Sequence, residues 1–92
     1  MKTRIMKTEK IHATIKNYIK HKSLDPTNLS TLSDDDSFFE NGIIDSVGVL
    51  ELVAFLEETF NMTIDDHELT LENLDSVNRL MSFIQSKIKN GP

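Results

Sequence analysis

Cysteine is absent from this chain of 92 residues, which also has only three glycine and two proline residues. Without cysteine there is no disulfide framework, no thiolate metal site and no cysteine nucleophile, so any thiol chemistry needs a thiol from another molecule. The few glycine and proline residues argue against a turn-rich β architecture. No segment approaches the ~20 apolar residues of a membrane-spanning helix, and the basic residues 1–7 lack the apolar run of a signal peptide. We therefore expect a cytoplasmic protein that does not insert into membranes.

Basic residues are missing from the middle of the chain. Between Ser23 and Asn78 there is no lysine or arginine, although fourteen of the fifteen acidic residues lie there. Nucleic acid is therefore not expected as a partner of this region, because contacts to phosphate need lysine and arginine. An acidic surface attracts basic partner proteins instead. The alternative is that the acidic surface only keeps a small protein in solution.

The length and composition predict one globular domain, residues 1–92, whose interior is too small for the deep cleft of a typical enzyme. Apolar residues recur at helical spacing in three long segments, about residues 8–21, 46–60 and 76–88, and residues 65–69 fit one short helical turn. Either Asp75 or Ser76 can cap the last helix. We expect an all-α fold, a small four-helix bundle of three long helices and one short one. Residues 1–7 are expected either to extend the first helix or to fray, and residues 90–92 to form a tail.

Residues 23–45 form a long predicted loop. A loop of this length in a small domain is either functional or anchored to the core. Three successive acids, Asp34 to Asp36, lack the ligand order of a calcium-binding loop, so we expect a solvated, charge-rich segment there. The apolar residues that are spaced to anchor the loop over a helical core are Leu24, Leu29, Leu32, Phe38, Phe39, Ile43 and Ile44.

The predicted helix 46–60 carries two stripes of residues at helical spacing. The stripe with the larger apolar face, assigned to the core, consists of Val49, Leu52, Val53, Leu56 and Phe60. The other stripe mixes apolar and acidic residues and is typical of a partly exposed surface for a partner protein. Its members are Val47, Leu50, Glu51, Ala54 and Glu58. The alternative is that Val47 and Leu50 are buried against the preceding loop, and Phe55 fits either environment.

Ser46 stands at the predicted start of this helix. The unpaired N–H groups of a first helical turn and the helix dipole favour a phosphate bonded at such a position, so we interpret Ser46 as the attachment point of a phosphate-linked prosthetic arm. The main alternative is a plain N-cap, which stabilises a helix by about 1 kcal/mol without further role. A catalytic serine is disfavoured because Ile44 stands where the hydrolase elbow has glycine. The three histidines have no spacing typical of a triad or a metal site, and His12 and His21 are expected on solvated faces of the first helix.

The residues around Ser46 resemble the acyl carrier protein family. The chain reads Asp45-Ser46-Val47 and continues as GVLELVAFLEETF, where the family has Asp-Ser-Leu and a helix of the type V-x-L-V-x-x-L-E-E-x-F. The approach from Asp36 to Gly42 is similar to the family pattern D-x-x-F-x-x-x-G-x-D-S. Residues 64–69 and 75–77 resemble the short third helix of the family and the start of its fourth. The likeness covers roughly residues 11–88.

The resemblance implies a carrier that is not itself an enzyme. In the family, a phosphopantetheinyl transferase attaches 4′-phosphopantetheine from coenzyme A to the serine after that aspartate, which here is Ser46 beside Asp45. The thiol of the arm then holds an acyl or aminoacyl group as a thioester. The implied partners of this monomeric carrier are the transferase, a loading ligase or synthase, and a downstream transferase, with basic docking surfaces. The docking residues indicated by the family positions and the second stripe are Val47, Leu50, Glu51, Ala54, Glu57 and Glu58.

Two residues after Ser46 depart from the family pattern. Val47 replaces the usual leucine, and Gly48 replaces a residue that is often acidic. Glycine lowers helix stability by up to about 1 kcal/mol relative to alanine, and it removes one acidic contact. These differences favour partners other than those of general fatty-acid synthesis. The residues from Gly42 to Ser46 are similar to those of stand-alone carriers, which include aminoacyl carriers, D-alanyl carriers and the carriers of specialised pathways. An unmodified helical interaction module is the alternative outside the family.

Overall fold

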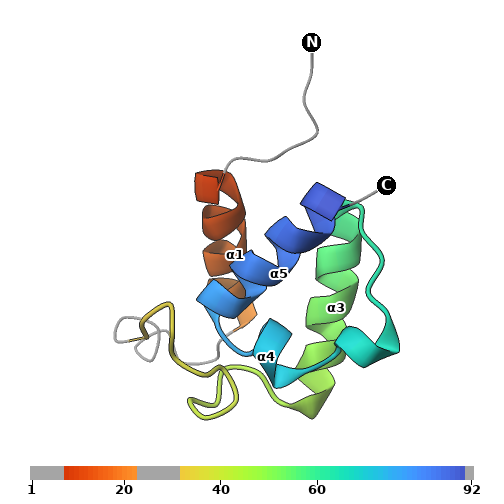
Figure 1. Ribbon diagram of the computed structural model, residues 1–92. Coiled ribbons are helices and arrows are strands. Elements are labelled where there is room, and N and C mark those ends of the chain that lie inside the picture. The colour runs from red at the N-terminus through yellow and green to blue at the C-terminus, as the bar shows by residue number, and fades with distance from the viewer. Residues whose placement is uncertain (1–7, 23–31, 91–92) are drawn as a thin grey trace.

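The structure is a computed structural model that describes residues 8–22 and 32–90. The expectations for residues 1–7, for the loop residues Leu24 and Leu29, and for the last two residues of the tail lie outside the described residues. Four α-helices and one 3-10 helix are described: α1 (Thr8–Lys22), α3 (Ser46–Phe60), η1 (Asp66–Glu68), α4 (Leu71–Leu74) and α5 (Val77–Asn90). Figure 1 shows α5 crossing between α1 and α3 in that view. The predicted all-α bundle is confirmed.

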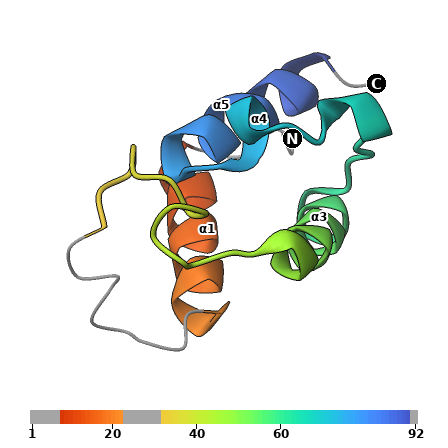
Figure 2. The ribbon, with the colours of Figure 1, turned by 90° about the horizontal axis from the view of Figure 1, so that it is seen from below.

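The three long helices enclose one core, and α5 contacts both α1 and α4. Figure 2 shows α1, α3 and α5 on three sides of a shared interior. Each long helix turns one apolar stripe inward, as its periodicity predicts. The most deeply buried residues of the three helices are Ile11, Ile15 and Ile19 of α1, Leu52 and Leu56 of α3, and Val77, Leu80 and Ile84 of α5.

The C-terminal end of α3 and the start of α5 are each set by a nearby residue. Asn61 takes a left-handed conformation, with φ of 53°, and its N–H donates to the carbonyl of Glu57, which ends α3. At the start of α5, the N–H of Arg79 donates to Oγ of Ser76 at 3.1 Å. Of the two candidate caps for α5, the structure therefore selects Ser76.

The segment before α3 is anchored by part of the predicted apolar set. Phe38, Ile43 and Ile44 are buried, whereas Phe39 is 36% exposed, so its prediction as an anchor is wrong. Gly42 takes a φ of +69°, which a residue with a side chain rarely adopts. This turn lets the N–H of Ile43 donate to the carbonyl of Phe38 at 2.8 Å, which closes the segment on itself.

The acidic run at residues 34–36 is bonded to two helices, so the expectation of a freely solvated segment is wrong. Asp34 accepts from His12 of α1 at 2.7 Å and from Lys16 at 3.2 Å. Asn78 of α5 donates its N–H to the carbonyl of Asp34 and its side-chain amide to Asp35. The hydrogen bond from His12 lowers the pKa of the Asp34 carboxyl. His12 was expected on a solvated face of the first helix, but its ring is bonded to Asp34, so this expectation is wrong.

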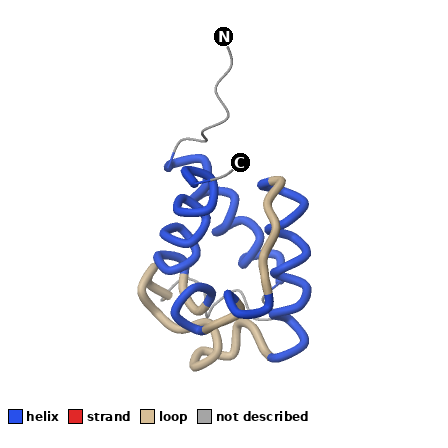
Figure 3. The backbone as a smooth tube through the Cα atoms, turned by 45° about the vertical axis from the view of Figure 1, so that its right-hand side comes forward, coloured by secondary structure: helices blue, strands red, loops and turns tan. Residues whose placement is uncertain are grey.

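The connection between α3 and α5 is more structured than the sequence predicts. The short helical turn expected at residues 65–69 is present as η1, but α4 follows it as a separate helix that the sequence did not indicate. The carboxylate of Glu68 accepts from Lys87 of α5 at 2.9 Å, which holds η1 against the bundle. Figure 3 shows only helices and loops in the described ranges. No helix within residues 8–22 and 32–90 is long and apolar enough to cross a membrane.

Candidate functional site

The first turn of α3 is fixed by Asp45, which is the N-cap residue. Asp45 has extended backbone angles, and its Oδ1 accepts from the N–H of Gly48 at 2.7 Å. Ser46 is therefore the first helical residue, and the alternative that its hydroxyl serves as the N-cap is wrong. Because the cap is supplied by its neighbour, the hydroxyl of Ser46 is not needed to start the helix.

The side chain of Ser46 is exposed at this helix start. Its own N–H and that of Val47 belong to the first turn and have no acceptor within the helix, whereas the N–H of Gly48 is bonded to Asp45. These groups and the positive end of the helix dipole favour a phosphate on the serine oxygen. A phosphodiester on Ser46 thus fits the site.

The arrangement around Ser46 does not support nucleophilic catalysis by this chain. His12 is bonded to Asp34, and His21 is bonded to the carbonyl of Asn17 within α1. In the described ranges no group of three or more histidine, aspartate or glutamate side chains is arranged so that it could hold a metal ion. His12 and His21 therefore have hydrogen-bond partners other than Ser46.

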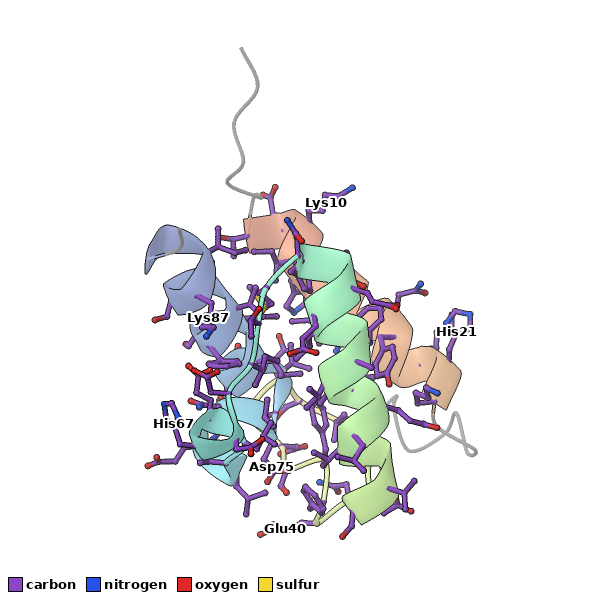
Figure 4. The ribbon with its side chains drawn as sticks, turned by 90° about the vertical axis from the view of Figure 1, so that its right-hand side faces the viewer. Lys10, His21, Glu40, His67, Asp75 and Lys87 are labelled. Atoms are coloured by element: carbon purple, nitrogen blue, oxygen red, sulfur yellow. The ribbon has the colours of Figure 1, made fainter. Side chains whose placement is uncertain are left out.

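The segment that leads to Ser46 is held by Asp75, a buried residue that sequence reasoning treated only as a possible helix cap. Its carboxylate accepts from Oγ of Ser37 at 2.5 Å and from the N–H of Phe39 at 3.0 Å, and its carbonyl accepts from the N–H of Phe38 at 3.0 Å. Figure 4 shows Asp75 inside the lower end of the molecule, with Glu40 on the outer edge. Asp75 positions the loop from which α3 begins.

The second stripe of α3 is exposed on the surface of the molecule. Val47 is 68% exposed and Leu50 is 66% exposed, so the alternative that they are buried against the loop is wrong. Ala54 and Glu58 continue the exposed stripe along the helix. On the opposite side, Leu52 and Leu56 enter the core. Exposed apolar side chains in one row are typical of a surface that a partner covers.

The acidic residues near this stripe differ in what they contact. Glu51 is exposed and accepts from Lys22 of α1 at 3.1 Å. Glu57 is half-buried, and its Oε2 accepts from the N–H of Ile64 at 2.9 Å, which holds the chain after α3. Helical spacing placed Glu51 on the second stripe, whereas Glu57 was indicated only by the family positions. Neither showed the partners that these two residues find in other segments.

Gly48 has little room for a side chain. A Cβ at this position would lie 3.2 Å from Oδ1 of Asp45 and 3.3 Å from Cγ2 of Ile44. Both distances are shorter than ordinary van der Waals contact. The glycine therefore lets the capping carboxylate and the buried Ile44 approach the first turn of α3, at the cost of helix propensity.

An open groove lies between α1 and α3, away from the residues around Ser46. It has a volume of about 640 Å³ and is lined by Lys10, Ala13, Thr14, Asn17, Tyr18, His21 and Phe55. The rings of Tyr18 and Phe55 stack in it with centroids 4.1 Å apart. Phe55 thus packs toward α1 and is not part of the exposed stripe.

Residues 14–84 match the family model described as "Phosphopantetheine attachment site". The chain belongs to this family of phosphopantetheine carriers. It is similar to the D-alanyl carrier protein of Streptococcus suis, with 32% identity over 74 residues that make up 80% of this chain and 90% of the relative. The D-alanyl carrier protein of Leuconostoc mesenteroides is 35% identical over 54 residues, which are 59% of this chain and 69% of the relative.

Membership gives this carrier its cofactor, 4′-phosphopantetheine, and places it among stand-alone carriers rather than enzymes. The group supplies a terminal thiol, which the cysteine-free chain lacks. The exposed hydroxyl of Ser46 and the N–H groups of the first turn of α3 are the features of the described chain that fit its phosphate.

Proposed function

We propose that Ser46 carries the 4′-phosphopantetheine arm and that the loaded protein holds an aminoacyl group, with D-alanine as the first candidate. The observation that carries the proposal is the exposed hydroxyl of Ser46 at the start of α3, beside a cap that is complete without it. Attachment joins the serine oxygen to the phosphate of the arm, releases the remaining nucleotide of coenzyme A and gives the hydroxyl proton to a base of the transferase.

The chain itself contributes position and recognition. Asp45 fixes the first turn of α3, and the exposed Val47 and Leu50 give a partner enzyme an apolar surface next to the arm. Tethering the cargo raises its local concentration at each partner site without lowering a chemical barrier. The partners of this proposal are a phosphopantetheinyl transferase, an amino-acid-loading ligase and a downstream transferase, each with a basic docking surface.

Intact-mass spectrometry after incubation with coenzyme A and a broad-specificity transferase tests the site. The wild type should gain the mass of one phosphopantetheinyl group, and Ser46→Ala should gain none. Ser82→Ala is the matched control, because Ser82 is an exposed serine of α5 remote in sequence from the proposed site. Modification of Ser46→Ala at the wild-type level would refute the assignment.

The cargo is tested separately on the modified protein. The names of the similar proteins support D-alanine, so a D-alanine-activating ligase should form a thioester on the modified wild type and none on the unmodified chain. L-Alanine and fatty acids, each with a matching activating ligase, serve as competing cargoes. Efficient loading with fatty acyl groups and none with D-alanine would contradict the aminoacyl assignment while leaving attachment at Ser46 intact.

A further inference from the structure

The exposed stripe of α3 meets the end of α1 at Glu51. Nζ of Lys22, the last residue of α1, lies 3.1 Å from Oε1 of Glu51. The same ammonium lies 5.6 Å from the centroid of the Tyr18 ring, which itself stacks on Phe55 of α3. Lys22 is therefore held by a carboxylate and by an aromatic face at once.

The other acids of the region are not equivalent to Glu51. Glu57 is half-buried and bonded to the N–H of Ile64. Glu58 is exposed on the outward stripe, and no ion pair or hydrogen bond joins its side chain to a residue in the described ranges. Because residues 23–78 contain no lysine or arginine, a lysine or arginine that reaches this face comes from residues 1–22, from residues 79–92 or from a partner.

We propose that Lys22 masks Glu51, so that the free docking surface consists of Val47, Leu50 and Ala54 with Glu58 as the acid that receives a cation of the partner. This inference rests on the proposed function of the stripe. The partner that fits is a protein with an apolar depression for Val47 and Leu50 and one lysine or arginine opposite Glu58. A partner cation competes with Lys22 for Glu51.

The arrangement of charge supports this partner. Lys22 already shows that an ammonium is accommodated beside Glu51, and the hydrogen bond that Lys22 donates to Glu51 raises the pKa of Lys22, which keeps it charged. Glu58 lies seven residues after Glu51 on the same stripe, two helical turns further along α3. The apolar centre with an acid at its edge is the usual composition of a protein-docking surface.

The size of the masking effect follows from the exposure of the pair. The side chains of Lys22 and Glu51 are 41% and 57% exposed, so water and salt screen their attraction. Removing the lysine should therefore raise the docking rate of a basic partner by about two- to fivefold at low salt, with the difference shrinking at high salt.

The experiment compares Lys22→Met with Lys20→Met in the full chain. Both variants remove one positive charge from an exposed residue of α1, but Lys22 is the lysine that donates to Glu51, so Lys22→Met is the variant that unmasks this acid. The measurement is kcat/KM for modification by a basic phosphopantetheinyl transferase, at low and at high salt. Lys22→Met should exceed Lys20→Met, and adding Glu51→Gln should abolish the excess. Far-UV circular dichroism checks that both variants keep their helices.

A second comparison addresses the free acid. In the wild-type background, Glu58→Gln should lower kcat/KM more than Glu51→Gln does. In the Lys22→Met background, the losses in kcat/KM caused by the two substitutions should become similar. Equal values for Lys22→Met and Lys20→Met, or a larger loss for Glu51→Gln than for Glu58→Gln in the wild type, would overturn the masking. A wild type that no transferase modifies would overturn the proposed function and the masking together. A wild type that is modified, with variants that do not differ as described, would overturn the masking alone, so the two failures are distinguishable.

Discussion

The capping of α3 by Asp45 predicts a specific order of stabilities. Asp45→Ala removes the acceptor of the 2.7 Å hydrogen bond from Gly48, and the loss of such a cap costs about 1 kcal/mol, within a range of about 0.5–2 kcal/mol. It also removes a negative charge from the positive end of the helix, which is worth about 0.3–1 kcal/mol at an exposed site. The expected total loss in the free energy of unfolding is about 1.5–2 kcal/mol.

Asp45→Asn separates the two contributions. Asparagine caps helices about as well as aspartate, so this variant should lose only the charge contribution, less than about 1 kcal/mol. Urea unfolding followed by far-UV circular dichroism gives the three free energies under one condition. Wild type should be the most stable and Asp45→Ala the least. Asp45→Ala with wild-type stability, or Asp45→Asn as unstable as Asp45→Ala, would refute the role of Asp45 as the cap.

The same variants report on the modification of Ser46. If the cap alone matters, Asp45→Asn should be modified at nearly the wild-type rate while Asp45→Ala is slower, because its first helical turn frays. A large drop in kcat/KM for Asp45→Asn at nearly unchanged stability would instead mean that the transferase contacts the carboxylate. The rate and the stability of each variant, measured side by side, separate these two roles.

Two further predictions concern the loop before α3. Asp75→Ala should lower the free energy of unfolding by about 2 kcal/mol, because it leaves the hydroxyl of Ser37 and the N–H of Phe39 without their acceptor in a partly buried place, and urea unfolding measures the loss. Asp75→Asn keeps one acceptor oxygen and should lose less; equal losses would contradict this account. Because the pKa of Asp34 is lowered in the native state, the native state binds fewer protons than the unfolded state. The Asp34 carboxylate therefore stabilises the fold above its ordinary pKa of 3.8, and this contribution disappears as the pH falls through the lower native pKa. Asp34→Asn should therefore have a flatter decline of stability in acid than the wild type, and an identical decline would argue against the His12 contact.

The sequence predicted the three long helices and the exposed stripe of α3 because both follow from local periodicity. The bounds of α3, for example, follow from its apolar spacing and from Asn61, which ends it. Contacts between distant segments were not predictable in this way. The spacing of Asp75 does not reveal that it accepts from Ser37, thirty-eight residues earlier.

Local reasoning also assigned some roles to the wrong neighbour. Asp45 and Ser46 are both good capping residues, and only the backbone conformation shows that Asp45 is the cap. Likewise, Phe38 and Phe39 are equally apolar, but the turn that closes at Ile43 buries the first and exposes the second. A shift of one residue is beyond the resolution of a pattern of hydrophobicity.

The most direct test of the central claim is to locate the arm on the peptide that carries Ser46. A trypsin digest is unsuitable, because residues 23–78 contain no lysine or arginine. A glutamate-specific protease that cuts after Glu40 and Glu51 releases residues 41–51, in which Ser46 is the only residue with a side-chain hydroxyl. The account predicts that this peptide carries one phosphopantetheinyl group after the transferase reaction. The group on a peptide from any other part of the chain, with residues 41–51 unmodified, would contradict it.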